Sequence, residues 1–128
     1  MTAPLSLLYV DDDPDIRTIV EMALGLDPSF TVRAVASGSD AVALLGDGEW
    51  RPDVLLLDVM MPEMDGLATL AALRALPGMA DTPVLFMTAK GREADVAQYL
   101  AHGAAGVILK PFDPLQLSAE IRALVGRP

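Results

Sequence analysis

Short runs of apolar residues alternate along this chain with longer segments in which apolar residues recur at helical spacing. The apolar runs predict five β-strands, over residues 5–10, 30–36, 54–57, 84–87 and 107–109. Three of these runs are almost uninterruptedly apolar, which is typical of parallel strands covered on both faces. The pattern therefore predicts repeated strand–helix units around a parallel sheet.

Amphipathic helices are predicted between the strands and after the last one. The first carries an apolar stripe at positions i, i+3, i+4, i+7 and i+8, formed by Ile16, Ile19, Val20, Ala23 and Leu24. A similar stripe near the carboxyl end consists of Leu117, Ile121, Leu124 and Val125, and we assign Leu115 to the same core-facing set. The three remaining helices are expected over residues 41–45, 67–76 and 94–100.

Two Asp-Pro pairs mark expected helix starts, Asp13-Pro14 and Asp113-Pro114. The carboxylate can accept hydrogen bonds from the first amides of a helix, and proline fits the first helical position. Right-handed crossovers then give an open, doubly wound α/β sheet with helices on both faces. At about 150 residues per domain, the 128 residues predict one domain over 1–128.

Composition excludes several classes of site. The chain has no cysteine and a single histidine, His102, so disulfides, thiolate zinc sites and multi-histidine metal sites are excluded. Nine Lys and Arg against eighteen Asp and Glu give a formal net charge of −9, which opposes direct binding to nucleic acid. No apolar run approaches the roughly 18 residues of a membrane span, and residues 1–4 lack the basic start of a signal peptide. We expect a soluble, cytoplasmic protein with no membrane partner.

Polar residues follow four of the five predicted strands. They are Asp11, Asp12 and Asp13 after the first strand, Asp58 after the third, Thr88 after the fourth and Lys110 after the fifth. Each alone could be a turn residue or a helix cap, and Asp13, next to Pro14, is assigned mainly to capping. Ligands of open α/β sheets bind beyond the carboxyl ends of the strands, so these side chains are expected to converge on one site.

Three of these residues, Asp11, Asp12 and Asp58, would bring negative charges into one crevice. Two carboxylates about 4 Å apart repel by roughly 4 kcal/mol at an effective dielectric of 20. Either a proton is taken up with a raised pKa, or a hard dication is bound. Mg²⁺ suits the few protein ligands better than Ca²⁺. Lys110 and Thr88 suit a phosphoryl group, and no glycine-rich nucleotide-binding loop is present.

Four motifs in order carry a resemblance to a known family. They are Leu8-Tyr9-Val10-Asp11-Asp12-Asp13-Pro14, then Leu56-Leu57-Asp58 continuing to Asp65-Gly66, then Met87-Thr88-Ala89, and finally Lys110-Pro111-Phe112. The set resembles the receiver domain of two-component response regulators, of the single-domain, chemotaxis-regulator-like kind, and the likeness covers nearly the whole chain. It implies a five-stranded parallel sheet of order 2-1-3-4-5, which is the flavodoxin-like fold.

The resemblance also implies a phosphorelay function and a role for each site residue. Asp58 would be the phosphoacceptor, taking a phosphoryl group from a phosphohistidine of a sensor histidine kinase or histidine phosphotransfer protein. Asp12, Asp58 and the backbone carbonyl of Met60 would bind Mg²⁺, with Asp11 helping through water. Thr88 and Lys110 would contact the phosphoryl oxygens.

The same resemblance implies a phosphorylation switch rather than a metabolic enzyme, with only self-catalysed phosphotransfer and dephosphorylation. The switch would control binding of an unknown output protein. The chain would be a monomer, or a weak homodimer through the face formed by the fourth helix, fifth strand and fifth helix. The bond before Pro111 is expected to be cis, as in the family, although only about 5–6% of such bonds are cis in folded proteins.

The chain departs from the family pattern at one switch position. The family usually has an aromatic residue three positions before the lysine, where this chain has Val107. We expect the output face to be coupled differently, with Tyr99 as the nearest substitute. Met60 and Lys90, two positions after Asp58 and Thr88, are expected to tune the lifetime of the acyl phosphate, and an apolar Met60 predicts a long-lived phosphoryl state.

Three alternatives stay open at this stage. The first is a haloacid-dehalogenase-like phosphatase, in which Asp11 would be the nucleophile and Asp13 the acid and base. The second is a receiver-like scaffold that works without phosphorylation, and the third is a longer regulator from which this sequence is one part. A phosphoryl relay through His102 is disfavoured, because a lone histidine near a helix end is usually solvated.

Overall fold

A computed structural model describes residues 4–89 and 91–126 of the chain. Its strands are β1 (Leu5–Val10), β2 (Phe30–Val35), β3 (Val54–Asp58), β4 (Val84–Thr88) and β5 (Gly106–Leu109). Its helices are α1 (Pro14–Gly25), α2 (Gly38–Leu45), α3 (Gly66–Arg74), α4 (Glu93–Ala101) and α5 (Leu117–Val125). All five predicted strands and all five predicted helices are present, with boundaries that shift by a few residues.

The strands form one parallel sheet in the order β2-β1-β3-β4-β5. This confirms the predicted fold and strand order. The register pairs Val10 with Leu57 and Asp58 with Met87, so the carboxyl ends of β1, β3 and β4 lie at nearly the same level. Residues that directly follow or end these strands are therefore neighbours.

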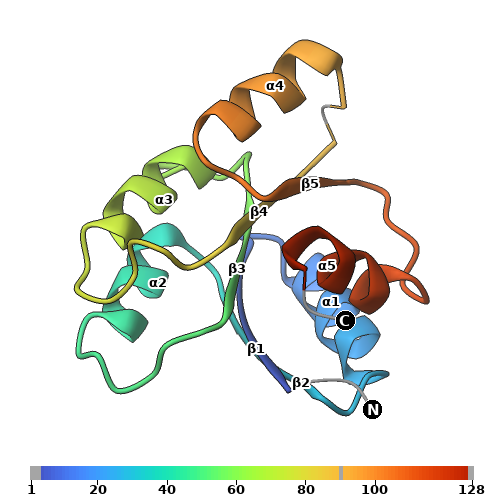
Figure 1. The fold of residues 1–128 in the computed structure, drawn as a ribbon, viewed down its shortest axis with the longest axis horizontal. Coiled ribbons are helices and arrows are strands. Elements are labelled where there is room, and N and C mark those ends of the chain that lie inside the picture. Colours follow the sequence, from blue (N-terminus) through green and yellow to red (C-terminus); the bar gives the residue numbers. More distant parts are fainter. Residues whose placement is uncertain (1–3, 90, 127–128) are drawn as a thin grey trace.

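Helices cover both faces of the sheet, with α1 and α5 on one face and α2, α3 and α4 on the other (Figure 1). Alternate strand residues point to the two sides, as a β-strand requires. Leu7, Tyr9 and Leu56 pack in the core beneath α1 and α5, whereas Leu8 and Leu55 pack beneath the other three helices. No helix in the described part of the chain has the length and apolarity that a membrane span requires.

The start of α1 agrees with the sequence. Asp13 is its N-cap, and its carboxylate accepts hydrogen bonds from the amides of Asp15 at 2.9 Å and Ile16 at 3.3 Å, with Pro14 at the first helical position. Capping is therefore the structural role of Asp13, as predicted.

The predicted start of the last helix is wrong by three residues, because α5 begins at Leu117. Asp113 instead closes a turn: its side chain accepts from the amide of Leu115 at 2.9 Å, and its carbonyl accepts from the amide of Gln116 at 3.0 Å. Leu115 lies in this turn with its side chain 76% exposed, so its assignment to the core is also wrong. The turn directs Leu115 away from the sheet before the apolar stripe begins.

An ion pair holds α5 near the amino end of β2, at the edge of the sheet opposite the carboxyl ends of the strands. Arg122 Nε lies 3.0 Å from Asp27 Oδ2, in the turn between α1 and β2, and its guanidinium lies 4.8 Å from the ring centroid of Phe30. A hydrogen bond from the amide of Ser29, together with the Arg122 guanidinium, holds the pKa of Asp27 below its ordinary value. This contact fixes α5 without using any residue of the carboxyl edge.

Candidate functional site

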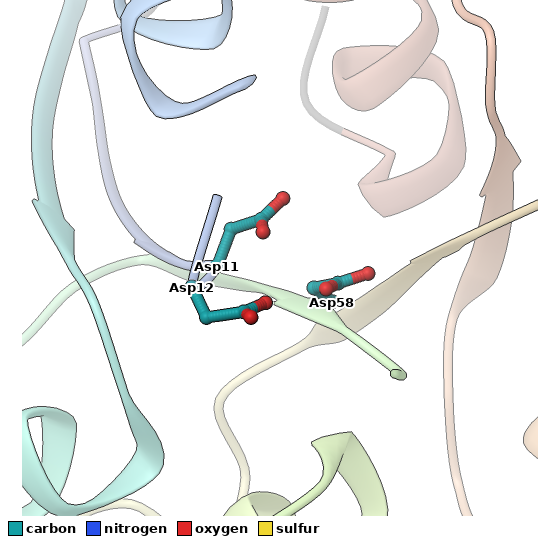
Figure 2. A group of neighbouring side chains, drawn as sticks. All are labelled: Asp11, Asp12 and Asp58. Atoms are coloured by element: carbon teal, nitrogen blue, oxygen red, sulfur yellow. The ribbon is translucent and has the colours of Figure 1, made fainter. Parts of the chain in front are cut away.

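Three carboxylates meet at the carboxyl edge of the sheet. Asp11 and Asp12 directly follow β1, and Asp58 is the last residue of β3. One oxygen from each can be chosen such that all three lie within 4.8 Å of one another, and Figure 2 shows the side chains together at this edge. Asp11 and Asp58 are buried, whereas Asp12 is exposed. The predicted convergence of these residues is confirmed.

Lys110 forms ion pairs with two of these carboxylates. Its Nζ lies 3.0 Å from Asp58 Oδ1 and 3.3 Å from Asp11 Oδ2. The residue follows β5, and its amide donates to the Thr88 carbonyl at 2.8 Å, which continues the sheet pairing beyond the strand. The Lys110–Pro111 peptide bond is cis, as expected from the resemblance.

Burial raises the pKa of Asp58 from 3.8 to about 6, and the charges of Asp11 and Asp12 act in the same direction. The hydrogen bond and charge of Lys110 oppose the rise without cancelling it. For Lys110 burial disfavours the charged form, but the contacts with Asp58 and Asp11 outweigh it, so its pKa is raised. The charge conflict inferred from the sequence is therefore present, and one ammonium does not resolve it.

Mg²⁺ fits this donor set. The carboxylate oxygens are hard ligands, two of the three side chains are held rigidly by burial, and the exposed Asp12 leaves one side open to water and phosphate oxygens. Mg²⁺ is usually bound by only a few protein ligands, and water or phosphate oxygens complete its coordination.

Asp11 is held by donors on both carboxylate oxygens. Oδ1 accepts from the Asp13 amide at 2.9 Å, and Oδ2 accepts from the Tyr9 hydroxyl and from Lys110. Sequence reasoning did not identify Tyr9 as a site residue. A signal was available: Tyr9 is the one aromatic residue in an otherwise almost apolar strand, and it precedes Asp11 by two, the spacing that places side chains on the same face.

The other predicted residues lie around this cluster. Thr88 ends β4, and its side chain is buried one residue beyond Met87, the partner of Asp58. Met60 is 62% exposed two residues after Asp58. Lys90, the second predicted tuning residue, lies outside the described residues.

The predicted switch positions lie on the side of α4. Val107 is half-buried in β5, and Tyr99 of α4 is buried against Phe86 of β4, with ring centroids 5.5 Å apart. An aromatic residue of α4 therefore packs on the strand that carries Thr88. His102 is exposed at the end of α4, away from the carboxylates, as expected for a solvated residue.

Comparisons with known proteins agree with this geometry. A family model described as the response regulator receiver domain matches residues 7–122. The chain is 36% identical over 127 residues to the response regulator Rre1 of Synechocystis, a match that covers 99% of this chain and 54% of that protein. This chain spans about half the length of the curated relatives that it matches first.

Solved structures show the same fold. The chemotaxis protein CheY4 of Vibrio cholerae superposes with a TM-score of 0.83 at 32% identity, covering 95% of this chain and 99% of that one. A sensor histidine kinase receiver domain from Pseudomonas aeruginosa superposes with a TM-score of 0.80 at 27% identity, covering 97% and 99%. That domain has a magnesium ion coordinated in its active-site cleft.

Proposed function

This chain belongs to the response regulator receiver domain family, and from that premise we propose that Asp58 is its phosphoacceptor. Receiver domains of this family act in two-component signalling, and the acid cluster of this chain is consistent with phosphorelay chemistry. The observation that supports Asp58 is its position: it ends β3 next to two further carboxylates and 3.0 Å from the Lys110 ammonium.

The proposed step is transfer from a phosphohistidine. A carboxylate oxygen of Asp58 attacks the phosphorus, an oxygen–phosphorus bond forms and the nitrogen–phosphorus bond breaks. The imidazole leaves with the electron pair and takes up a proton. Lys110 and Thr88 contact the oxygens of the transferred group, where negative charge is spread in the transition state. Water later hydrolyses the acyl phosphate, which resets the switch, and no metabolic turnover is proposed.

Mg²⁺ is the cofactor that we propose for this step. Asp12, Asp58 and the backbone carbonyl of Met60 would hold it, with Asp11 acting through water. When bound, the ion neutralises charge on the phosphoryl oxygens and on the carboxylates. The acidic oxygen set supports this assignment, and so does the magnesium ion in the related Pseudomonas domain.

The proposed domain covers residues 1–128, and its phosphoryl donor is a sensor histidine kinase or histidine phosphotransfer protein. We propose a cytoplasmic location and an output protein whose binding depends on phosphorylation. The net charge of −9 argues against direct contact with nucleic acid by this part of the chain. A weak homodimer would use α4, β5 and α5.

A phosphatase mechanism with Asp11 as nucleophile has little support. Asp11 is fully buried and accepts three hydrogen bonds, and the side chain of Asp13 caps α1, although it would be needed as acid and base. No observation on the described residues favours a scaffold that is indifferent to phosphorylation.

Beryllofluoride, a phosphoryl mimic, tests the proposal when it is added with Mg²⁺ and followed by NMR. We expect resonances around β3 and β4 to shift in the wild type and in Asp13→Asn, and no shift in Asp58→Asn. A response that survives Asp58→Asn, or that is lost only in Asp13→Asn, would contradict Asp58 as the acceptor.

A further inference from the structure

We propose that Tyr9 is a positioning residue for phosphoryl transfer. Its hydroxyl donates a hydrogen bond to Asp11, and this bond favours the contact of the Lys110 ammonium with Asp58 over the contact with Asp11. This inference rests on the proposed function, because it concerns how the chain prepares Asp58 and Lys110 for the reaction.

Tyr9 lies directly beneath the acid cluster. Its side chain is fully buried, and it shares with Asp11 and Asp58 the face of the sheet that α1 and α5 cover. Its ring reaches across β3, because its hydroxyl lies 3.5 Å from the Met87 sulfur of β4. Tyr9 therefore lies between the hydrophobic core and the carboxylate cluster.

The hydroxyl has one proton, so it can donate to only one of its two neighbours. Asp11 Oδ2 is closer than the Met87 sulfur, and an ionised carboxylate is a far stronger acceptor than a thioether. The proton is therefore directed at Asp11. This leaves the sulfur as a packing contact that fixes the ring from the β4 side.

Asp11 Oδ2 is shared between Tyr9 and Lys110. An oxygen that already accepts a strong hydrogen bond is a weaker acceptor for a second donor. This agrees with the distances from Lys110 Nζ, which are 3.3 Å to Asp11 and 3.0 Å to Asp58. Without the hydroxyl, Asp11 would attract the ammonium more strongly, and Lys110 would move away from Asp58.

The hydroxyl is not needed for packing. A phenylalanine would fill the same space among apolar neighbours without requiring a hydrogen-bond partner, and every other residue of β1 except Ser6 is apolar. The hydroxyl oxygen instead lies against Asp11, a member of the carboxylate cluster.

Tyr9→Phe tests the proposal by removing only the hydroxyl. With acetyl phosphate as donor and saturating Mg²⁺, we expect the phosphorylation rate to fall about tenfold, the order expected for the loss of one hydrogen bond to a charged group. The matched control is Thr69→Val, which removes a buried hydroxyl from α3, and it should keep the wild-type rate. A wild-type rate in Tyr9→Phe would overturn the proposal.

A double-mutant cycle separates positioning from general destabilisation. If the hydroxyl acts through Asp11, then Tyr9→Phe should have little further effect on the rate in an Asp11→Asn background, because coupled residues are not additive. Equal effects in both backgrounds would overturn the proposal. The folded fraction of each variant is checked by circular dichroism before the rates are compared.

Mg²⁺ alone gives a readout that needs neither phosphotransfer nor a Tyr9 variant. The chain has two tyrosines, so in Tyr99→Phe any tyrosine signal comes from Tyr9. We expect Mg²⁺ to change the near-ultraviolet absorbance of Tyr9, because the ion changes the charge that the hydroxyl faces. No tyrosine difference spectrum in Tyr99→Phe would contradict the proposed contact. A spectrum without phosphorylation of wild-type Asp58 would instead place the failure in the proposed function.

Discussion

At the scale of single residues, the site is a balance of charges around one carboxylate. In the proposed transfer, burial of Asp58 would exclude water, but burial also disfavours the anion that would attack phosphorus. Lys110 supports the anion, and Asp11 and Asp12 oppose it. A bound dication would shift this balance toward the anion.

The raised pKa of Asp58 predicts a pH dependence of stability in the absence of Mg²⁺. Because the folded chain binds this proton more tightly than the unfolded chain does, the contribution is fully present below the ordinary pKa of 3.8 and is lost as the pH rises through about 6. Urea unfolding at about pH 5 and about pH 7.5 measures the loss. Asp58→Asn should lose less stability over this interval than the wild type, and an equal loss would contradict the assignment.

The apolar side chain of Met60 predicts a long lifetime of the phosphorylated state. Its apolar side chain stands two residues after Asp58 and is 62% exposed, where it would hinder an approaching water. Met60→Asn should shorten the half-life of the acyl phosphate by about tenfold, which corresponds to about 1.4 kcal/mol in the barrier. Met22→Asn, at an exposed methionine of α1, is the control and should leave the half-life unchanged. The explanation fails if Met60→Asn has the wild-type half-life.

The cluster members could be predicted from the sequence, because Asp11, Asp12, Asp58 and Lys110 each follow or end a strand. For Tyr9 the sequence offers only a weaker signal, its spacing of two from Asp11, since an aromatic residue inside a strand usually belongs to the core. The hydrogen bond to Asp11 then distinguishes its hydroxyl from that of an ordinary buried tyrosine.

At the scale of elements, the connection from β3 to α3 packs closely against the backbone at the end of β3. The amide of Gly66 donates to the Val59 carbonyl at 3.0 Å, and Asp65 caps α3 by accepting from the Ala68 amide at 2.8 Å. The first residue of α3 therefore packs directly against the end of β3. A side chain at this point has no space.

Gly66→Ala tests this close approach. The added Cβ would lie 2.5 Å from the Asp58 carbonyl oxygen and 2.9 Å from the Val59 Cα, which are backbone atoms that cannot yield without moving Asp58. We expect a loss of about 2 kcal/mol in the free energy of unfolding and a slower phosphorylation. Gly25→Ala, at the end of α1 where a Cβ meets nothing within 4 Å, should be neutral or slightly stabilising. Equal stability of the two variants would show that the contact is absent.

Helix starts show where local sequence signals hold and where they fail. Asp13-Pro14 begins α1 as predicted, because β1 ends three residues earlier and the cap leads straight into the apolar stripe. Asp113-Pro114 has the same local chemistry but forms a turn, and α5 begins only at Leu117. An Asp-Pro pair alone therefore does not determine where a helix begins.

At the scale of the whole molecule, strand–helix alternation was enough to predict a doubly wound sheet, and the strand order followed from the family resemblance. The order places β3 at the centre with β1 and β4 on either side, so the strands that lead to Asp11, Asp58 and Thr88 are neighbours. The output face could not be predicted in the same way. Val107 stands where the family usually has an aromatic residue, and only the fold shows that Tyr99 packs on Phe86 of β4, the strand that Thr88 ends.

The most direct test of the central claim is mass spectrometry with peptide mapping after incubation with acetyl phosphate and Mg²⁺. One phosphoryl group is expected, on Asp58, absent from Asp58→Asn and absent when Mg²⁺ is removed by chelation. A chain that stays unmodified, or one that carries the group on any other residue, would contradict it.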